Sequence, residues 1–214
     1  MIKGVIFDLD GVLVSTDEYH YLGWKRVSEE EGFPFDRELN HRLRGVSRME
    51  SLDIILEAAG MQLERAEKEI IAARKNGYYR EYLESIDKAA LLPGAEEILH
   101  ELIRLGIKRA IASSSKNARL IVERTGILDL VDEIADGNDI NESKPSPEVF
   151  LIAAKRLCLD ASECLVVEDA EAGVEAGLRA GMKVLGIGSR DMLKNAHLVV
   201  ENLSKITVGR MLSI

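Results

Sequence analysis

Short apolar segments alternate with helical patterns along most of the chain, and this alternation constrains the fold more than any other feature. Strands are predicted at residues 2–7, 107–112, 165–167, 184–187 and 198–200. Helices are predicted between them, at residues 95–105, 118–124, 148–157 and 170–180. Gly106, Gly126 and Gly181 follow three of these helices, where a left-handed residue commonly ends a helix. The pattern predicts an α/β fold with a Rossmann-like parallel sheet covered on both faces.

The segment from residue 15 to residue 92 breaks the alternation. It contains no convincing strand, only amphipathic helical patterns at residues 18–31, 48–59 and 64–84. It also holds Trp24 and all five tyrosines. We therefore predict a helical cap domain at 15–92, inserted into an α/β core domain formed by 1–14 and 93–214. The alternative is that these helices only cover one face of the sheet.

Composition narrows the class of protein. The 214 residues include 28 basic and 37 acidic side chains, a formal net charge of −9, which argues against a nucleic-acid partner. No apolar run approaches the roughly 20 residues that span a bilayer. The N-terminal residues do not resemble a signal peptide, and two cysteines, Cys158 and Cys164, are too few for a disulfide framework. We expect a cytoplasmic monomer without a membrane partner.

Four groups of polar residues are expected at the sheet edge where open α/β folds bind ligands, and three of them directly follow predicted strands. The first group is Asp8-Leu9-Asp10-Gly11. Carboxylates two positions apart leave a strand on the same side, and the glycine lets the chain turn tightly. Asp8 and Asp10 can therefore divide the roles of nucleophile and general acid/base. The alternative is a solvated turn.

The other three groups carry hydroxyl, ammonium and carboxylate side chains. Ser113 opens a run of polar residues that precedes a helix, an arrangement that binds anions or merely caps the helix. Lys144 stands before Pro145 at a second helix start, where it can balance phosphate charge or lie at the surface. Glu168 and Asp169 follow a buried strand and offer oxygen ligands suited to Mg²⁺, or simply complement a helix dipole.

Taken in chain order, these four groups resemble the motifs of the haloacid dehalogenase superfamily of aspartate-nucleophile phosphotransferases. The resemblance extends from residue 2 to about residue 188 and includes a helical cap after the first motif. It implies that Asp8 is the nucleophile, that Asp10 is the general acid/base, and that Ser113 and Lys144 hold the transferring phosphoryl group. It also implies a Mg²⁺ ion held by Asp8, the Asp10 carbonyl and Asp169, with Glu168 contributing directly or through water.

Further residues resemble the members of this superfamily that isomerise β-D-glucose 1-phosphate. They are Thr16, His20, Trp24, Gly45, Val46, Ser47, Arg48, Ser51 and Lys75 in the cap, with Ser114, Ser115, Lys116 and Asn117 in the core. The resemblance implies a sugar-phosphate substrate bound by these residues. Arg48 can clamp a phosphate with its planar fork of donors. Each of Arg48, His20 and Trp24 also has a purely structural interpretation, as a solvated or packed helix residue.

The implied reaction converts β-D-glucose 1-phosphate to glucose 6-phosphate through an aspartyl phosphate, with β-glucose 1,6-bisphosphate as intermediate and activator. The non-transferring phosphate would lie on Arg48 and the 115–117 segment. His20 and Lys75 would couple the closure of the cap to Asp10, and Thr16 would lie at the hinge. Ser15, where relatives usually have an acid, and Ser114, where alanine is common, depart from the pattern.

Two other functions remain open at this stage. A Mg²⁺-dependent sugar-phosphate phosphatase of the same superfamily would use the same core residues. A non-catalytic phosphoacceptor or sugar-phosphate-binding module would need Asp8 but would have no need of a second, acid/base role for Asp10.

Overall fold

The computed structural model describes residues 1–43 and 46–214, which divide into two compact units. The core unit comprises Met1–Ser15 and Asp87–Ile214, and the cap unit comprises Thr16–Ile86. Residues 87–92 lie with the core because the Ser15 amide donates to the Ala90 carbonyl and the Leu92 amide to the Leu13 carbonyl, each at 2.9 Å. No helix in the described residues is long and apolar enough to cross a membrane.

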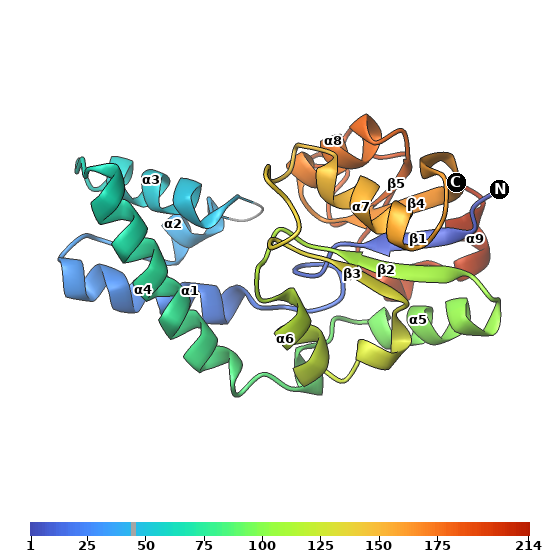
Figure 1. The fold of residues 1–214 in the computed structure, drawn as a ribbon, viewed down its shortest axis with the longest axis horizontal. Coiled ribbons are helices and arrows are strands. Elements are labelled where there is room, and N and C mark those ends of the chain that lie inside the picture. The colour runs from blue at the N-terminus through green and yellow to red at the C-terminus, as the bar shows by residue number, and fades with distance from the viewer. Residues whose placement is uncertain (44–45) are drawn as a thin grey trace. The chain divides into compact units, whose positions relative to one another are not determined.

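The core unit is built on one six-stranded sheet in the order β3-β2-β1-β4-β5-β6, with every neighbouring pair parallel (Figure 1). The strands are β1 (Gly4–Phe7), β2 (Lys108–Ala112), β3 (Glu133–Ala135), β4 (Cys164–Glu168), β5 (Lys183–Ile187) and β6 (Leu198–Val200). The predicted parallel sheet is confirmed. The sequence analysis missed β3, because three residues beginning with an acid are too short to show a period.

Helices cover both faces of the sheet, as predicted. Those of the core unit are α5 (Ala95–Arg104), α6 (Ala118–Arg124), α7 (Glu148–Arg156), α8 (Glu171–Arg179) and α9 (Val208–Leu212). Single 3₁₀ turns occupy Lys88–Ala90, Leu128–Leu130, Ala161–Glu163 and Leu203–Lys205. Figure 1 shows α7 and α8 on one face and α5 on the other, where α9 packs against α5. Gly106, Gly126 and Gly181 have φ of 68°, 76° and 76°, the left-handed conformation expected after a helix.

The register of the central strands aligns their carboxyl ends. Phe7, the last residue of β1, pairs with Ile111 of β2 on one side and with Val167 of β4 on the other. All four residues of β1 and all five of β4 are buried, as expected for strands covered by helices on both faces. The polar residues that follow β1, β2 and β4 therefore emerge at the same edge of the sheet.

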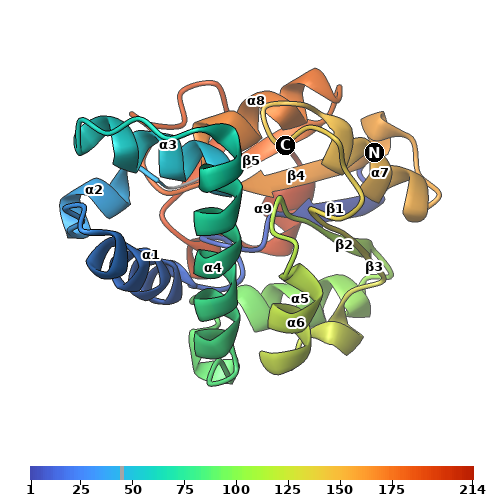
Figure 2. The same ribbon diagram turned by 60° about the vertical axis from the view of Figure 1, so that its left-hand side comes forward.

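Helices joined by loops make up the described residues of the cap unit. It contains α1 (Asp17–Glu31), α2 (Arg37–His41), α3 (Arg48–Ala58) and α4 (Arg65–Leu83). Figure 2 shows α1 and α3 beside α4, and their buried faces form a separate apolar cluster that includes Trp24, Leu52 and Ile71. The sequence analysis missed α2, a five-residue helix that begins after the N-cap Asp36.

Candidate active site

The chain reverses direction immediately after β1, where it presents Asp8. This aspartate is only 8% exposed, and its amide donates to the Val167 carbonyl at 2.9 Å, which continues the pairing with β4. Gly11 has φ of 85°, and its amide donates to the Val14 carbonyl at 2.8 Å. The positive φ explains why glycine follows the two aspartates, because it lets the turn close within a few residues. Asp10 lies in this turn and is partly exposed.

Lys144 lies at the centre of the site. Its ammonium donates to an Asp8 carboxylate oxygen, to Glu168 Oε1 at 2.7 Å and to the Ala112 carbonyl at 3.1 Å. Its side chain is 7% exposed, and its Nζ lies 4.9 Å from the centroid of the Phe150 ring. Burial lowers the pKa of Lys144, but the two carboxylates outweigh this and hold it above the ordinary value, so the ammonium stays charged.

Two acids lie at the carboxyl end of β4, Glu168 as its last residue and Asp169 just after it, and each carboxylate packs against a glycine. A Cβ atom at Gly173 would lie 1.8 Å from Glu168 Oε1, and one at Gly11 would lie 2.0 Å from Asp169 Oδ2. Glu168 is 1% exposed and also accepts a hydrogen bond from the Ala170 amide at 2.8 Å. The absence of side chains at both glycines therefore makes the space that these carboxylates occupy.

The site carries more negative than positive charge. Burial raises the pKa of Asp8 well above its usual range; Lys144 opposes this rise, and Glu168 and Asp169 add to it. Burial, followed by the neighbouring Glu168, raises the pKa of Asp169 to about 7, and Asp10 adds to the rise. A single ammonium thus does not neutralise the acids at this edge of the sheet.

An oxygen-rich set of this kind suits a divalent cation such as Mg²⁺, which takes carboxylate and carbonyl ligands and keeps waters. Burial raises the pKa of both Asp8 and Asp169 and the neighbouring acids add to the rise, so a nearby cation would favour their ionised forms. Among the described residues, however, no three acidic, histidine or cysteine side chains converge as a ready metal cluster. The oxygen donors of this site nevertheless have the chemistry that Mg²⁺ takes. The Glu168 carboxylate is bonded to Lys144 and does not converge with the other acids on one point.

The segment after β2 forms a compact polar turn. Ser113 is 2% exposed; its amide donates to the Ala135 carbonyl at 3.0 Å, and its hydroxyl accepts from the Ser115 amide at 3.1 Å. The Ser115 hydroxyl accepts in turn from the Asn117 amide at 3.2 Å, just before α6. Ser114 and Ser115 are partly exposed, Lys116 is exposed and Asn117 is buried. This turn therefore offers hydroxyl and amide groups at the same sheet edge as Asp8.

In the cap unit, α1 and α4 bring His20 and Lys75 together. Lys75 is 2% exposed, and its Nζ lies 2.8 Å from His20 Nδ1. Burial, then the charges of Lys75 and Arg48, hold the pKa of His20 well below its usual value, so its imidazole is neutral and Nδ1 accepts from the ammonium. The His20 ring stacks on Tyr79 with a centroid separation of 4.1 Å.

Aromatic rings surround the Lys75 ammonium, which lies 4.6 Å from the Tyr79 centroid and 5.3 Å from that of Trp24. Trp24 is 2% exposed and belongs to the apolar cluster of the cap, so it packs as well as facing the lysine. The sequence analysis did not single out Tyr79. Its position four residues after Lys75, on the same face of a helix, is the signal that could have found it.

Of the remaining predicted cap residues, Val46, Ser47, Arg48 and Ser51 lie at the start of α3, whereas Thr16 is the N-cap of α1. The Ser47 hydroxyl caps this helix by accepting from the Glu50 amide at 3.3 Å. Arg48 is partly exposed, and burial lowers its pKa, while Tyr79 opposes that change. Of the others, Thr16 and Ser51 are buried, Val46 is partly exposed, and Gly45 lies outside the described residues.

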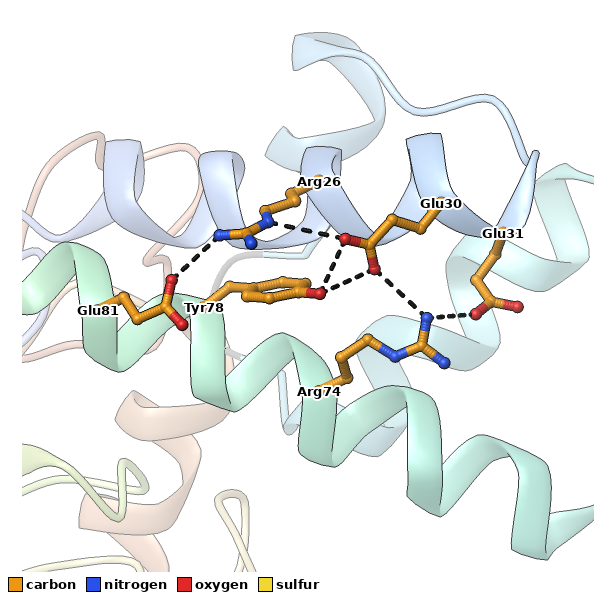
Figure 3. Close-up of polar contacts among 6 residues, drawn as sticks. All are labelled: Arg26, Glu30, Glu31, Arg74, Tyr78 and Glu81. Atoms are coloured by element: carbon orange, nitrogen blue, oxygen red, sulfur yellow. Dashed lines mark hydrogen bonds and ion pairs between the residues drawn. The ribbon is translucent and has the colours of Figure 1, made fainter.

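A network of charged residues joins the exposed sides of α1 and α4, as Figure 3 shows. The Arg26 guanidinium lies 3.7 Å from the Tyr78 ring centroid and 3.0 Å from Glu81, and the Tyr78 hydroxyl donates to Glu30 at 2.8 Å. Arg74 bridges Glu30 at 3.3 Å and Glu31 at 2.6 Å. Exposed pairs stabilise little individually, but this network ties together the two helices that carry His20 and Lys75.

Comparison with known proteins places these observations in a family. The model of the haloacid dehalogenase-like hydrolases matches residues 2–181. A β-phosphoglucomutase of Bacillus subtilis is 42% identical over 209 residues, 97% of this chain and 92% of its own. The crystal structure of a β-phosphoglucomutase from Clostridium difficile superposes with a TM-score of 0.91 at 39% identity, covering 98% and 95% of the two chains. A phosphorylated carbohydrates phosphatase of Thermotoga maritima is 33% identical, with 85% and 83% covered.

Proposed function

This chain belongs to the haloacid dehalogenase-like hydrolase family, and from that premise we propose that it is a β-phosphoglucomutase. Its reaction is the interconversion of β-D-glucose 1-phosphate and glucose 6-phosphate. The similarity to the Bacillus subtilis enzyme supports the proposal because it runs through the cap as well as the core. The observation that carries the chemistry is the buried ammonium of Lys144 on the carboxylate of Asp8. We further propose that it works as a monomer in the cytoplasm.

In the proposed mechanism, Asp8 attacks the phosphorus of a sugar bisphosphate or monophosphate. A bond forms between its carboxylate oxygen and phosphorus, and the bond from phosphorus to the departing sugar oxygen breaks. Asp10 gives that oxygen its proton. In the second half, a sugar hydroxyl oxygen bonds to phosphorus, the bond from phosphorus to Asp8 breaks, and Asp10 takes the proton of that hydroxyl. The Lys144 ammonium and the Ser113 hydroxyl hold the phosphoryl oxygens, so that catalysis rests on positioning and charge.

We propose that Asp8, the carbonyl of Asp10 and Asp169 hold Mg²⁺, with Glu168 supplying further negative charge. When bound, the ion supplies charge neutralisation to the transferring phosphoryl group. The setting of Asp8 and Asp169 supports this, because burial, and then the neighbouring acids, raise the pKa of both carboxyls, so a bound cation would favour their ionised forms. Mg²⁺ should raise the melting temperature of the protein, and the rise should be lost in Asp169→Asn.

We propose that the cap residues recognise the sugar phosphate. His20 and Lys75 are a neutral imidazole and a buried ammonium in contact, a pair that can orient a sugar hydroxyl or an acid. Thr16, Trp24, Val46, Ser47, Arg48 and Ser51 are the further cap candidates, and the partly exposed Arg48 is the phosphate ligand among them. Ser114 and Ser115, with Lys116 and Asn117, would bind phosphate from the core. β-Glucose 1,6-bisphosphate would then serve as intermediate and activator.

A coupled assay tests the proposal. β-D-Glucose 1-phosphate, Mg²⁺ and a trace of the 1,6-bisphosphate are supplied, and glucose 6-phosphate and inorganic phosphate are measured in parallel. Glucose 6-phosphate formed with little free phosphate supports the mutase, and Asp8→Asn should abolish it. Free phosphate in excess would instead indicate a sugar-phosphate phosphatase, the activity named for the Thermotoga maritima relative. Phosphate binding without turnover would indicate a binding module.

A further inference from the structure

The loop from residue 136 to residue 147 carries Lys144, whose ammonium lies in a buried site. It joins β3 to α7 and is the yellow segment between them in Figure 1. The Lys144 side chain passes from this loop to Asp8 and Glu168 and is only 7% exposed when it arrives. Ordering a lysine side chain costs rotamer entropy, so a backbone already held in place favours the one geometry in which the ammonium reaches both acids.

Glu148, in the first turn of α7, holds the segment just before the lysine. Its Oε2 accepts hydrogen bonds from the amides of Asn141 and Glu142, both at 2.9 Å. Its Oε1 accepts from the Asn141 side-chain amide at 3.0 Å. These hydrogen bonds, the one from the Glu142 amide first, hold the pKa of Glu148 below its usual value, so the carboxylate is ionised at neutral pH.

The last turn of α7 holds the start of the same loop. Arg156 pairs with both carboxylate oxygens of Asp139, at 2.6 and 2.9 Å, and also donates to the Ile134 carbonyl. The Ser146 amide donates to the Ser143 carbonyl at 3.1 Å and closes a turn around the lysine. Helix α7 therefore fixes residues 139, 141 and 142, which leaves Ser143–Ser146 as the short span that carries Lys144.

We propose that Glu148 is a positioning residue for Lys144: it fixes the Asn141–Glu142 backbone and so sets where the lysine enters the phosphoryl site. The role given to Lys144 rests on the proposed function, whereas the positioning itself follows from contacts within the core unit. An acid in the first turn of a helix usually serves the helix dipole alone. Here both carboxylate oxygens are engaged by the loop, so the charge acts on the loop.

Chemical labelling of lysines tests the positioning directly, without substrate. The protein is treated with an amine-acylating reagent, and the labelling rates of Lys144 and Lys75 are measured by mass spectrometry. Both ammonium groups are buried, so both should react slowly in the wild type. In Glu148→Ala the rate at Lys144 should rise roughly tenfold, because three hydrogen bonds to the loop are lost, while Lys75 in the cap unit should not change.

Two further variants complete the comparison. Asn141→Ala removes only the side-chain bond to Glu148 and should raise the Lys144 rate by a smaller factor. Glu97→Ala removes an exposed acid from the first turn of α5 and should leave both lysines unchanged. Glu148→Gln keeps one acceptor oxygen for the two backbone amides and should restore most of the protection.

The proposal is overturned if Lys144 stays as protected in Glu148→Ala as in the wild type while the variant is folded. Hydrogen exchange of the β4 amides shows whether the core unit of the variant is folded, because Lys75 lies in the other unit. If Glu148→Ala loses the protection of these amides, Asn141→Ala decides, with unchanged protection of Lys144 counting against the proposal. In an active enzyme, the Glu148→Ala loss should fall on kcat more than on KM, because Lys144 faces the transferring group rather than the sugar. The labelling result stands whether or not the protein proves to be a mutase.

Discussion

Replacing Gly173 by alanine should destabilise the protein, although a glycine-to-alanine change normally stabilises a helix. Gly173 lies in the first turns of α8, where alanine normally stabilises a helix by about 1 kcal/mol relative to glycine. A Cβ atom there would lie 1.8 Å from Glu168 Oε1 and 1.9 Å from its Cδ, whereas ordinary contacts begin near 3.4 Å. The Glu168 side chain cannot move freely to another conformation, because it is 1% exposed and hydrogen-bonded to Lys144 and to the Ala170 amide.

The expected magnitude follows from these contacts. Displacing the carboxylate breaks at least one buried, charge-assisted hydrogen bond, which costs about 1.5–3 kcal/mol. The crowding that remains costs about 1–3 kcal/mol as the side chain or the helix shifts. After the helix-propensity gain of about 1 kcal/mol is subtracted, Gly173→Ala should lower the free energy of unfolding of the core unit by about 1.5–5 kcal/mol. Lys144 also loses one of its two carboxylate partners, so activity should fall.

Hydrogen exchange of the β4 amides measures this change in the unit concerned. The sole tryptophan, Trp24, lies in the cap unit, so its fluorescence does not report on the core. Gly209→Ala is the matched control, because a Cβ atom at this α9 position meets nothing within 4 Å and should be neutral or stabilising. If Gly173→Ala protects the β4 amides as well as the wild type does, the argument from the Glu168 contact is wrong.

Three other changes have expected outcomes. Lys75→Met should raise the pKa of His20 towards 6.5, because it removes a neighbouring positive charge, while burial continues to lower that pKa. A proton NMR titration that finds the pKa of His20 unchanged would contradict the pairing of the two residues. A maleimide at pH 8 should label the exposed Cys158 and spare the buried Cys164, whose pKa burial raises to about 11; mass spectrometry showing equal labelling would refute this. Asp10→Asn should lower kcat by roughly 10²- to 10⁴-fold with an unchanged circular dichroism spectrum, and a smaller loss would remove its acid/base role.

The parallel sheet could be predicted because its long strands are apolar on both faces and end abruptly at polar residues. The same rule fails for β3 and α2, whose few residues do not complete a period. The predicted helix at 148–157 and α7 begin at the same residue, Glu148, where the Ser146 hydroxyl accepts from the Glu148 amide at 3.4 Å.

Part of the candidate site could likewise be predicted from the sequence, and part could not. Convergence of Asp8, Ser113 and Glu168 follows from the rule that parallel strands end at one edge, so the sequence was sufficient to predict it. Lys144 reaches Asp8 and Glu168 from the irregular loop between β3 and α7, so the strand-end rule does not place it. The sequence could not predict that Gly173 makes room for Glu168, because a glycine in a helix has no local signature of what approaches it. The sequence could not predict the hydrogen-bond partners of Glu148 either, since they depend on the path of an irregular loop.

The chain leaves the core unit after Ser15 and rejoins it at Asp87, and the two crossings are bonded to each other. Val14 bridges Leu91, and the amides of Ser15 and Leu92 each donate across the junction at 2.9 Å. An insertion whose ends are already joined adds little loop-closure entropy, however long it is. Residues 16–86 could therefore be replaced by another folded segment whose ends lie equally close, while the sheet of the core unit keeps its register.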